Sequence, residues 1–117
     1  MALDKPKVVK ADEIEPKPVE GATGTRIRVL ISSSDAPTFA MRLFEMDPGG
    51  HIELHSHPWE HEIFVLRGRV RVRIGDQTIE AGPRTAIYIP PNVPHEYWCI
   101  SEEKAEFICV IPNKPSA

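Results

Sequence analysis

Four of the five histidines in this 117-residue chain lie within eleven residues of one another, at His51, His55, His57 and His61. In an extended strand, residues two positions apart point to the same face, so His55 and His57 would present both imidazoles to one side. A short turn or bulge at the intervening Pro-Trp-Glu could return His61 to the same place. Imidazole nitrogen atoms at this spacing predict that one metal ion is bound between them.

The fifth histidine, His95, follows a proline-rich turn over residues 90–94 and opens another predicted strand. From that position a facing strand can complete the ligand shell. Three or four neutral imidazoles suit Zn, Cu, Fe or Ni, and also Mn when the protein enforces the geometry. His51 is expected to lie outside the site, as an ordinary surface or core histidine. Both cysteines, Cys99 and Cys109, stand apart from the cluster, so a structural zinc finger is excluded.

The elements that must position these side chains are strands, because hydrophobic and polar residues alternate with a period of two from Arg26 onward. In residues 69–74 arginine and aliphatic residues alternate strictly, and the three arginines are expected to form a solvated face. With turn residues between the strands and no convincing helix, this pattern predicts an all-β sandwich, barrel or jelly roll. The predicted strands cover residues 26–31, 38–46, 61–67, 69–74, 85–89, 95–100 and 105–111, and the predicted turns 47–50, 68, 75–76, 81–83 and 90–94.

Composition and charge limit the class of protein. A chain of this length forms one domain with a single core, and 41% hydrophobic with 26% charged residues is typical of a soluble globular protein. No apolar run approaches the roughly 20 residues that cross a bilayer. The net charge is −3 and no basic cluster occurs, which argues against DNA or RNA as a partner. The first residues contain no signal sequence, so we expect a cytoplasmic protein with reduced cysteines.

The two ends of the chain differ from its middle. Residues 1–25 are rich in charge and proline, which predicts an extended arm that becomes ordered by lying along another surface, such as a partner subunit. Residues 26–112 form the predicted barrel, and residues 113–117 a short tail. The predicted strand 105–111 is hydrophobic on both faces, so one face can meet a second subunit. The expected assembly is a homodimer.

The histidine cluster has the spacing of a known family motif. Gly49-x5-His55-x-His57-x3-His61-x6-Gly68 is similar to the first conserved motif of the cupins. Within that family, this part of the chain most resembles the small single-domain bacterial cupins that bind one metal ion through four histidines. The usual cupin set is three histidines and one glutamate.

A second motif follows further along the chain. Gly82-x7-Pro90-x-Asn92-x2-His95 resembles the second cupin motif, with Asn92 in place of its glycine. With the flanking strands, the resemblance covers about residues 26–112. It implies an all-β fold, the double-stranded β-helix or jelly-roll barrel of the cupins, with a metal ion inside the barrel near one mouth.

The resemblance also implies the metal ligands. One divalent metal ion per chain would be held by His55, His57, His61 and His95. Manganese is the first candidate, and iron, copper, nickel and zinc are the others. Glu62 is an alternative to His61, because a motif with one more intervening residue would place the carboxylate of Glu62 among the ligands. In a regular strand the two neighbours point to opposite faces.

The expected ligand shell indicates what the ion could do. Four protein ligands leave two positions open on an octahedral ion, which suits a bidentate substrate or a substrate together with dioxygen. Because neutral histidines leave the charge of the ion uncancelled, a small anionic or enediol-like substrate is expected. We therefore expect a metal-dependent oxidoreductase of the dioxygenase type. A non-catalytic module that binds small molecules, a cupin isomerase or decarboxylase, and a purely structural ion remain alternatives.

Five further side chains are candidates for the wall of the substrate pocket. On the predicted strand that carries the last histidine, Tyr97 and Cys99 lie on the metal side, and Phe107 and Cys109 share one face of the final strand. Arg42 interrupts an apolar run. It could point inward and pair with a substrate carboxylate, or lie outward on a half-exposed strand.

Overall fold

The computed structural model describes residues 5–113, so the predicted tail over 113–117 lies outside the described residues apart from its first position. Strands dominate this part of the chain, which has a short 3-10 turn at Ala11–Glu13 and no α-helix. No helix in it is long and apolar enough to cross a membrane. The strands are β1 (Lys17–Pro18), β2 (Ala22–Ile31), β3 (Phe39–His55), β4 (His61–Arg67), β5 (Val70–Ile74), β6 (Gln77–Ala81), β7 (Ala86–Ile89), β8 (His95–Cys99) and β9 (Ala105–Pro112).

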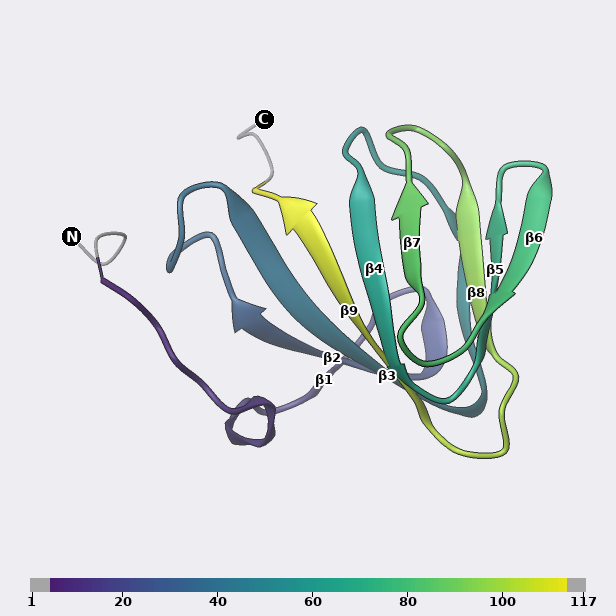
Figure 1. Ribbon diagram of the computed structural model, residues 1–117, viewed down its shortest axis with the longest axis horizontal. Helices are drawn as coiled ribbons and strands as arrows, with labels where there is room; N and C mark the ends of the chain where they lie inside the picture. The colour runs from purple at the N-terminus through teal and green to yellow at the C-terminus, as the bar shows by residue number, and fades with distance from the viewer. Residues whose placement is uncertain (1–4, 114–117) are drawn as a thin grey trace.

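These strands form one antiparallel sheet in the order β6-β5-β8-β3-β9-β4-β7, with β2 paired to β3 and β1 paired to β2. Strand β3 is long enough to serve both halves of the sheet. Its first half pairs with β2 and β9, and its second half pairs with β8. The sheet therefore curls back on itself, as Figure 1 shows, and forms the jelly-roll barrel that the all-β pattern predicts.

Alternating burial places one set of side chains inside the barrel. On β4, His61, Ile63 and Val65 are buried, while the residues between them are exposed. On β5 the valines face inward, and Arg71 and Arg73 face solvent, as predicted. The same period of two on β8 and β9 completes the core. The largest fully buried side chains are Phe107, Met46, Ile89, His95, Val65, Val70, Val72 and Cys109.

The predicted turn over residues 47–50 is wrong, because β3 runs through it without reversing. Gly49 has a φ of +79°, and the pairing of β3 with β2 shifts register nearby. A Cβ atom on Gly50 would lie 2.9 Å from the carbonyl oxygens of Asp47 and Gly24, so only glycine allows the two strands to approach this closely. The Pro-Gly-Gly sequence therefore makes a bulge in a continuous strand.

Two further strand boundaries differ from the prediction. Strand β2 begins at Ala22, four residues before the predicted start, and β3 continues to His55. Strand β6 is absent from the prediction, because its sequence Gln-Thr-Ile-Glu-Ala offers one large apolar residue and shows no clear period. Its place in the sheet is decided by the hairpin with β5, which has complete register from Val70–Ala81 to Ile74–Gln77.

The described part of the N-terminal arm packs on its own chain. Strand β1 pairs with β2, and the guanidinium of Arg28 donates hydrogen bonds to the carbonyl oxygens of Ala11 and Ile14. Lys7 forms an ion pair with Asp35, with 2.7 Å between Nζ and Oδ2. These contacts lie within one chain, and the contact of the arm with a partner subunit stays a prediction.

Candidate metal centre

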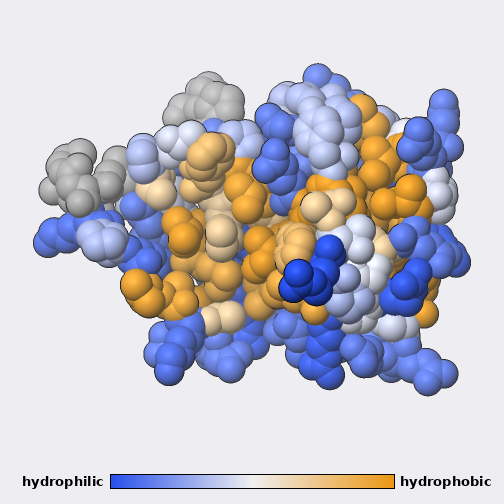
Figure 2. Space-filling model, in the orientation of Figure 1, coloured by the Kyte–Doolittle hydropathy of each residue, from blue (hydrophilic) through white to orange (hydrophobic). Residues whose placement is uncertain are grey.

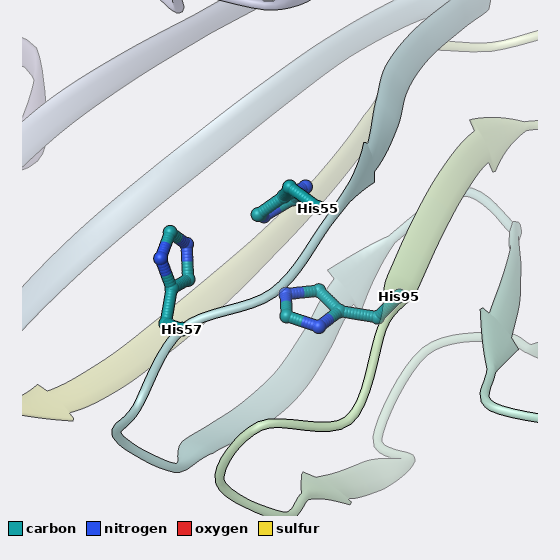
Figure 3. A group of neighbouring side chains, drawn as sticks. All are labelled: His55, His57 and His95. Carbon is teal, nitrogen blue, oxygen red and sulfur yellow. The ribbon is translucent and has the colours of Figure 1, made fainter.

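Three of the predicted ligands converge at one mouth of the barrel. His55 ends β3, His57 lies in the loop that follows, and His95 begins β8 directly opposite His55 in the strand register. One ring nitrogen from each of the three lies within 4.8 Å of the others. Figure 3 shows the three imidazoles pointing toward one another. This arrangement can hold a divalent metal ion.

His61 lies beside this group without being part of it. As the first residue of β4, it points into the barrel and is buried. Its ring centroid is 4.8 Å from that of His95 and 5.2 Å from that of His57. The structure thus brings three of the four predicted ligands together and leaves the fourth imidazole adjacent.

Hydrogen bonds to main-chain carbonyl groups set the tautomers of His55 and His95. Nδ1 of His55 lies 2.7 Å from the carbonyl oxygen of Glu53, and Nδ1 of His95 lies 2.9 Å from that of Val93. Because a carbonyl oxygen only accepts, each Nδ1 carries the proton and donates it. Each Nε2 therefore keeps its lone pair free to bind a metal ion.

Burial keeps the two innermost imidazoles neutral. Burial lowers the pKa of His61 to about 3, and electrostatic interaction with the neighbouring His95 and Arg42 lowers it further. Burial also lowers the pKa of His95. Nδ1 of His61 and Nε2 of His95 are buried without a hydrogen-bond partner among the described residues. Buried, neutral and unsatisfied nitrogen atoms fit a divalent metal ion, and they do not identify which one.

One residue beside the histidines, Trp59, is not predicted by the sequence analysis. The indole of Trp59 stacks flat on His57, with 4.5 Å between ring centroids and an interplanar angle of 6°. Trp59 also packs against the hydrophobic core, so it connects a ligand on an irregular loop to the rigid barrel. The signal that could have revealed it is a large aromatic residue between two predicted ligands.

The histidines open into a cavity of about 340 Å³. Its floor is a stack of three aromatic rings, in which Phe44 lies 5.2 Å from Phe107 and Phe107 lies 5.5 Å from Tyr97. Its lining also includes Arg42, Cys109, His55, His57 and His61. Four of the five predicted pocket residues are therefore in this cavity, namely Arg42, Tyr97, Phe107 and Cys109.

Cys99 does not line the cavity. It lies two residues beyond Tyr97 on β8 and is buried deeper in the barrel, where its sulfur is 3.6 Å from Oγ of Ser101. Strand phase puts Cys99 on the inner face, as predicted, but the barrel is filled by core side chains at that depth.

The two remaining candidates near the cluster face away from it. Glu62 is exposed on the outer face of β4, so its carboxylate does not point toward the three converging histidines. Nε2 of His51 donates a hydrogen bond to Oε2 of Glu96, with 2.6 Å between them, and the His51 ring stacks on Trp98. Its place outside the group formed by His55, His57 and His95 agrees with the prediction.

Comparison with known proteins identifies the family to which the fold and the site belong. The Cupin domain family matches residues 42–111. The structure of the polyketide cyclase RemF from Streptomyces resistomycificus is 35% identical, with a TM-score of 0.87 over 94% of this chain and 81% of that one. The polyketide synthase CurC of Streptomyces cyaneus is 29% identical over 107 residues, 89% of this chain and 68% of CurC.

A third relative is named for a different activity. It is the 1-methylthio-D-xylulose 5-phosphate methylsulfurylase of Rhodospirillum rubrum, 29% identical over 84 residues. The match covers 72% of this chain and 54% of the relative, so the chain spans about half the length of that protein. The matched residues 42–111 contain the converging histidines and most of the cavity, and on this evidence the chain belongs to the cupin family.

Proposed function

We propose that this cupin is a metal-dependent enzyme that cyclises a small poly-β-carbonyl compound through its enolate. The observation that carries the proposal is the joining of two features in one cavity. Histidines that can hold a divalent ion line it, and a stack of three aromatic rings forms its floor. An aromatic floor suits a planar, conjugated substrate.

The proposed ligand set is His55, His57, His61 and His95, which adds the adjacent imidazole to the three that converge. Manganese is the first candidate, with iron, copper, nickel and zinc as the others. When bound, a divalent ion supplies Lewis-acid stabilisation of a carbonyl or enolate oxygen. The neutral histidines leave its charge uncancelled, so an anionic or enediol-like oxygen ligand is favoured.

The chain's own residues supply the rest of the chemistry. Phe44, Phe107 and Tyr97 give the substrate an apolar surface to pack against and exclude water from that side. Burial raises the pKa of the Tyr97 phenol, so this group stays protonated and can donate a hydrogen bond to a carbonyl oxygen. Such positioning favours ring closure over other fates of a flexible chain.

The relatives support cyclisation in particular. RemF, at 35% identity over most of both chains, is a polyketide cyclase, and CurC is named a polyketide synthase. An oxygen-dependent oxidoreductase of the dioxygenase type is the second candidate. The apolar walls of the cavity beside the histidines favour it, because they would admit dioxygen together with an enolate.

Diacetylacetone provides a test of both candidates. Intramolecular aldol condensation of this triketone forms one carbon–carbon bond, releases one water and gives orcinol without any oxidant. We expect metal-loaded protein to accelerate the appearance of orcinol, followed by its absorbance and by chromatography. His57→Ala should abolish the acceleration, and His51→Ala should retain it. Oxygen uptake with cleavage of the triketone would favour the oxidoreductase instead, and no turnover with any of the five metals would overturn both.

We also propose that the chain forms a homodimer. The outer faces of β4 and β7 expose Phe64, Leu66 and Tyr88, and Figure 2 shows apolar side chains gathered over the region where β9 and β4 lie. Light scattering after size exclusion should give twice the chain mass. Phe64→Glu should shift it to the monomer, and the neighbouring Glu62→Gln should leave it unchanged. A monomeric wild-type chain would contradict the proposal.

A further inference from the structure

Arg42 is a charged side chain without a carboxylate partner inside the cavity. Its Nη2 donates to the sulfur of Cys109 at 3.2 Å, and its guanidinium carbon lies 5.2 Å from the centre of the Phe44 ring. Its Nε is buried and has no hydrogen-bond partner among the described residues. A guanidinium has five N–H donors, so most of the donors of Arg42 remain available.

An arginine on the neighbouring strand shows what ordinary pairing looks like in this fold. Arg28 on β2 is also largely enclosed, and its Nε lies 3.3 Å from a carboxylate oxygen of Glu45. Within residues 5–113, Arg42 has no ion pair of this kind. An enclosed charge without a counter-ion costs free energy, and proteins keep such groups mainly where a ligand uses them.

The groups around Arg42 do not neutralise it. Burial raises the pKa of the Cys109 thiol despite the nearby guanidinium, so the sulfur stays protonated and uncharged. Burial likewise keeps Tyr97 protonated. Glu20 and Glu53 also line the cavity, but both are exposed and neither forms an ion pair with Arg42. The interior of the cavity is therefore electropositive at this end.

The aromatic floor connects Arg42 to the histidines. Arg42 lies against Phe44, the stack continues through Phe107 to Tyr97, and Tyr97 contacts His95 at 5.8 Å between ring centroids. Arg42 also lies close enough to His61 to lower its pKa, so a molecule in this cavity can contact the histidines and the guanidinium together. The cavity thus has two attachment points for one substrate.

We propose that Arg42 binds a carboxylate of the substrate, so that the substrate is an acid with a β-dicarbonyl group at its far end. Arg42 is the one Lys or Arg among the described residues that line the cavity, and a single guanidinium balances a single negative charge. A phosphate group, with a charge near −2 at neutral pH, would be only partly balanced. The dicarbonyl end rests on the proposed function, whereas the carboxylate end does not.

Succinylacetone tests the carboxylate end and the dicarbonyl end of the proposed substrate together, because it carries both groups. Its methyl ester lacks only the charge and serves as the comparison. Binding to metal-loaded protein is followed by calorimetry. The wild-type chain should bind the acid roughly tenfold or more tightly than the ester. Arg42→Gln should lose that preference while binding the ester as before, and Arg42→Lys should keep part of it. Arg73→Gln, an exposed arginine on β5, is the matched control and should behave as wild type.

Benzoate and inorganic phosphate test the carboxylate end alone, on metal-free protein. Benzoate should bind the wild-type chain and fail to bind Arg42→Gln, with circular dichroism confirming that the variant is folded. An acid preference that survives in Arg42→Gln, or phosphate binding more tightly than benzoate, would overturn the assignment. Failure of the ester to bind metal-loaded protein, with benzoate still dependent on Arg42, would count against the proposed function and leave the role of Arg42 intact.

Discussion

Two regions on opposite faces of β3 differ in whether their charged and polar side chains have partners within the chain. On the outer face, the buried carboxylate of Glu45 lies 3.3 Å from Arg28 and 3.7 Å from Lys104, and Arg26 pairs with Asp47 at 2.9 Å. Inside the barrel lie an arginine without a carboxylate partner and two histidine nitrogen atoms that are buried without hydrogen bonds among the described residues. Arg42 and Glu45, three positions apart on the same strand, thus belong to an unsatisfied group and to a satisfied network.

This difference separates the charges that are paired within the fold from the groups that lack a partner among the described residues. The outer network ties β2 to β3 and anchors the arm through Arg28, so each charge there has a partner within the chain. The inner groups have nitrogen atoms without hydrogen-bond partners among the described residues. A folded protein tolerates such atoms where a ligand supplies the missing partner. The sequence of each region contains charged residues between apolar ones, and only the fold shows which of them lack partners.

Metal addition should produce the largest effect on the inner region. A bound ion completes the unsatisfied nitrogen atoms, so an excess of about 1,000 times the dissociation constant should raise the free energy of unfolding by about 4 kcal/mol. Thermal denaturation with and without the ion measures this. His95→Gln should lose the effect, and His51→Gln, whose histidine pairs with Glu96 elsewhere, should keep it. Equal stabilisation of both variants would place the ion somewhere else.

Removing a charge from each region should then give opposite results. Glu45→Gln leaves Arg28 without its counter-ion, and we expect the free energy of unfolding to fall by about 3 kcal/mol. Arg42→Gln removes a charge that lacks a carboxylate partner, so the metal-free protein should change by less than about 1 kcal/mol. Urea denaturation of both variants provides the measurement. If Arg42→Gln lowered the free energy of unfolding as much as Glu45→Gln, the proposed difference between the two faces would be wrong.

Acid should lower the stability of the metal-free protein through protonation of His61 in the unfolded chain. Its pKa is about 3 in the folded chain against an ordinary value of 6.5, so between these values the unfolded chain binds a proton that the folded chain does not. The free energy of unfolding of metal-free protein should therefore fall as the pH drops below 6.5, by on the order of 2 kcal/mol at pH 5. Denaturation across this range should show a flatter profile for His61→Gln. Identical profiles for the two proteins would contradict the assignment.

The smallest effect is expected for ion pairs in contact with solvent. Arg71 and Glu80 lie 3.0 Å apart on exposed faces of β5 and β6. Because such pairs are screened by water, Arg71→Gln should change the free energy of unfolding by less than about 0.5 kcal/mol. Chemical denaturation compared with Glu45→Gln separates exposed from enclosed pairs. A loss equal to that of Glu45→Gln would mean that burial does not determine the strength of pairing here.

Much of the fold is visible in the sequence because its signals are local. The period of two over residues 61–74 requires one buried face, and it predicts both β4 and β5. The spacing of His55 and His57, with His95 at the start of a later strand, predicts the convergence that the structure shows. These signals depend on neighbours along the chain, so no knowledge of distant contacts is needed.

The sequence-based predictions are wrong or incomplete where the structure depends on contacts between residues far apart in the sequence. The Pro-Gly-Gly of residues 48–50 is as suitable for a turn as for a bulge, and its approach to Gly24 on β2 determines the outcome. Arg42 stands in a run that is apolar on both faces, so periodicity cannot tell which way it points. Its pairing opposite Cys109 on β9 settles this. Trp59 is likewise recognisable as part of the site only once the loop is folded against His57.

Elemental analysis of metal per chain tests the central claim most directly, namely that the unsatisfied inner groups form a metal site. Protein prepared without chelators and loaded with manganese, iron, copper, nickel or zinc in turn should retain about one ion per chain for at least one of these metals. His57→Ala should retain none, and His51→Ala should retain as much as the wild-type chain. Full occupancy in His57→Ala, or no retention of any of the five metals by the wild-type chain, would contradict the claim.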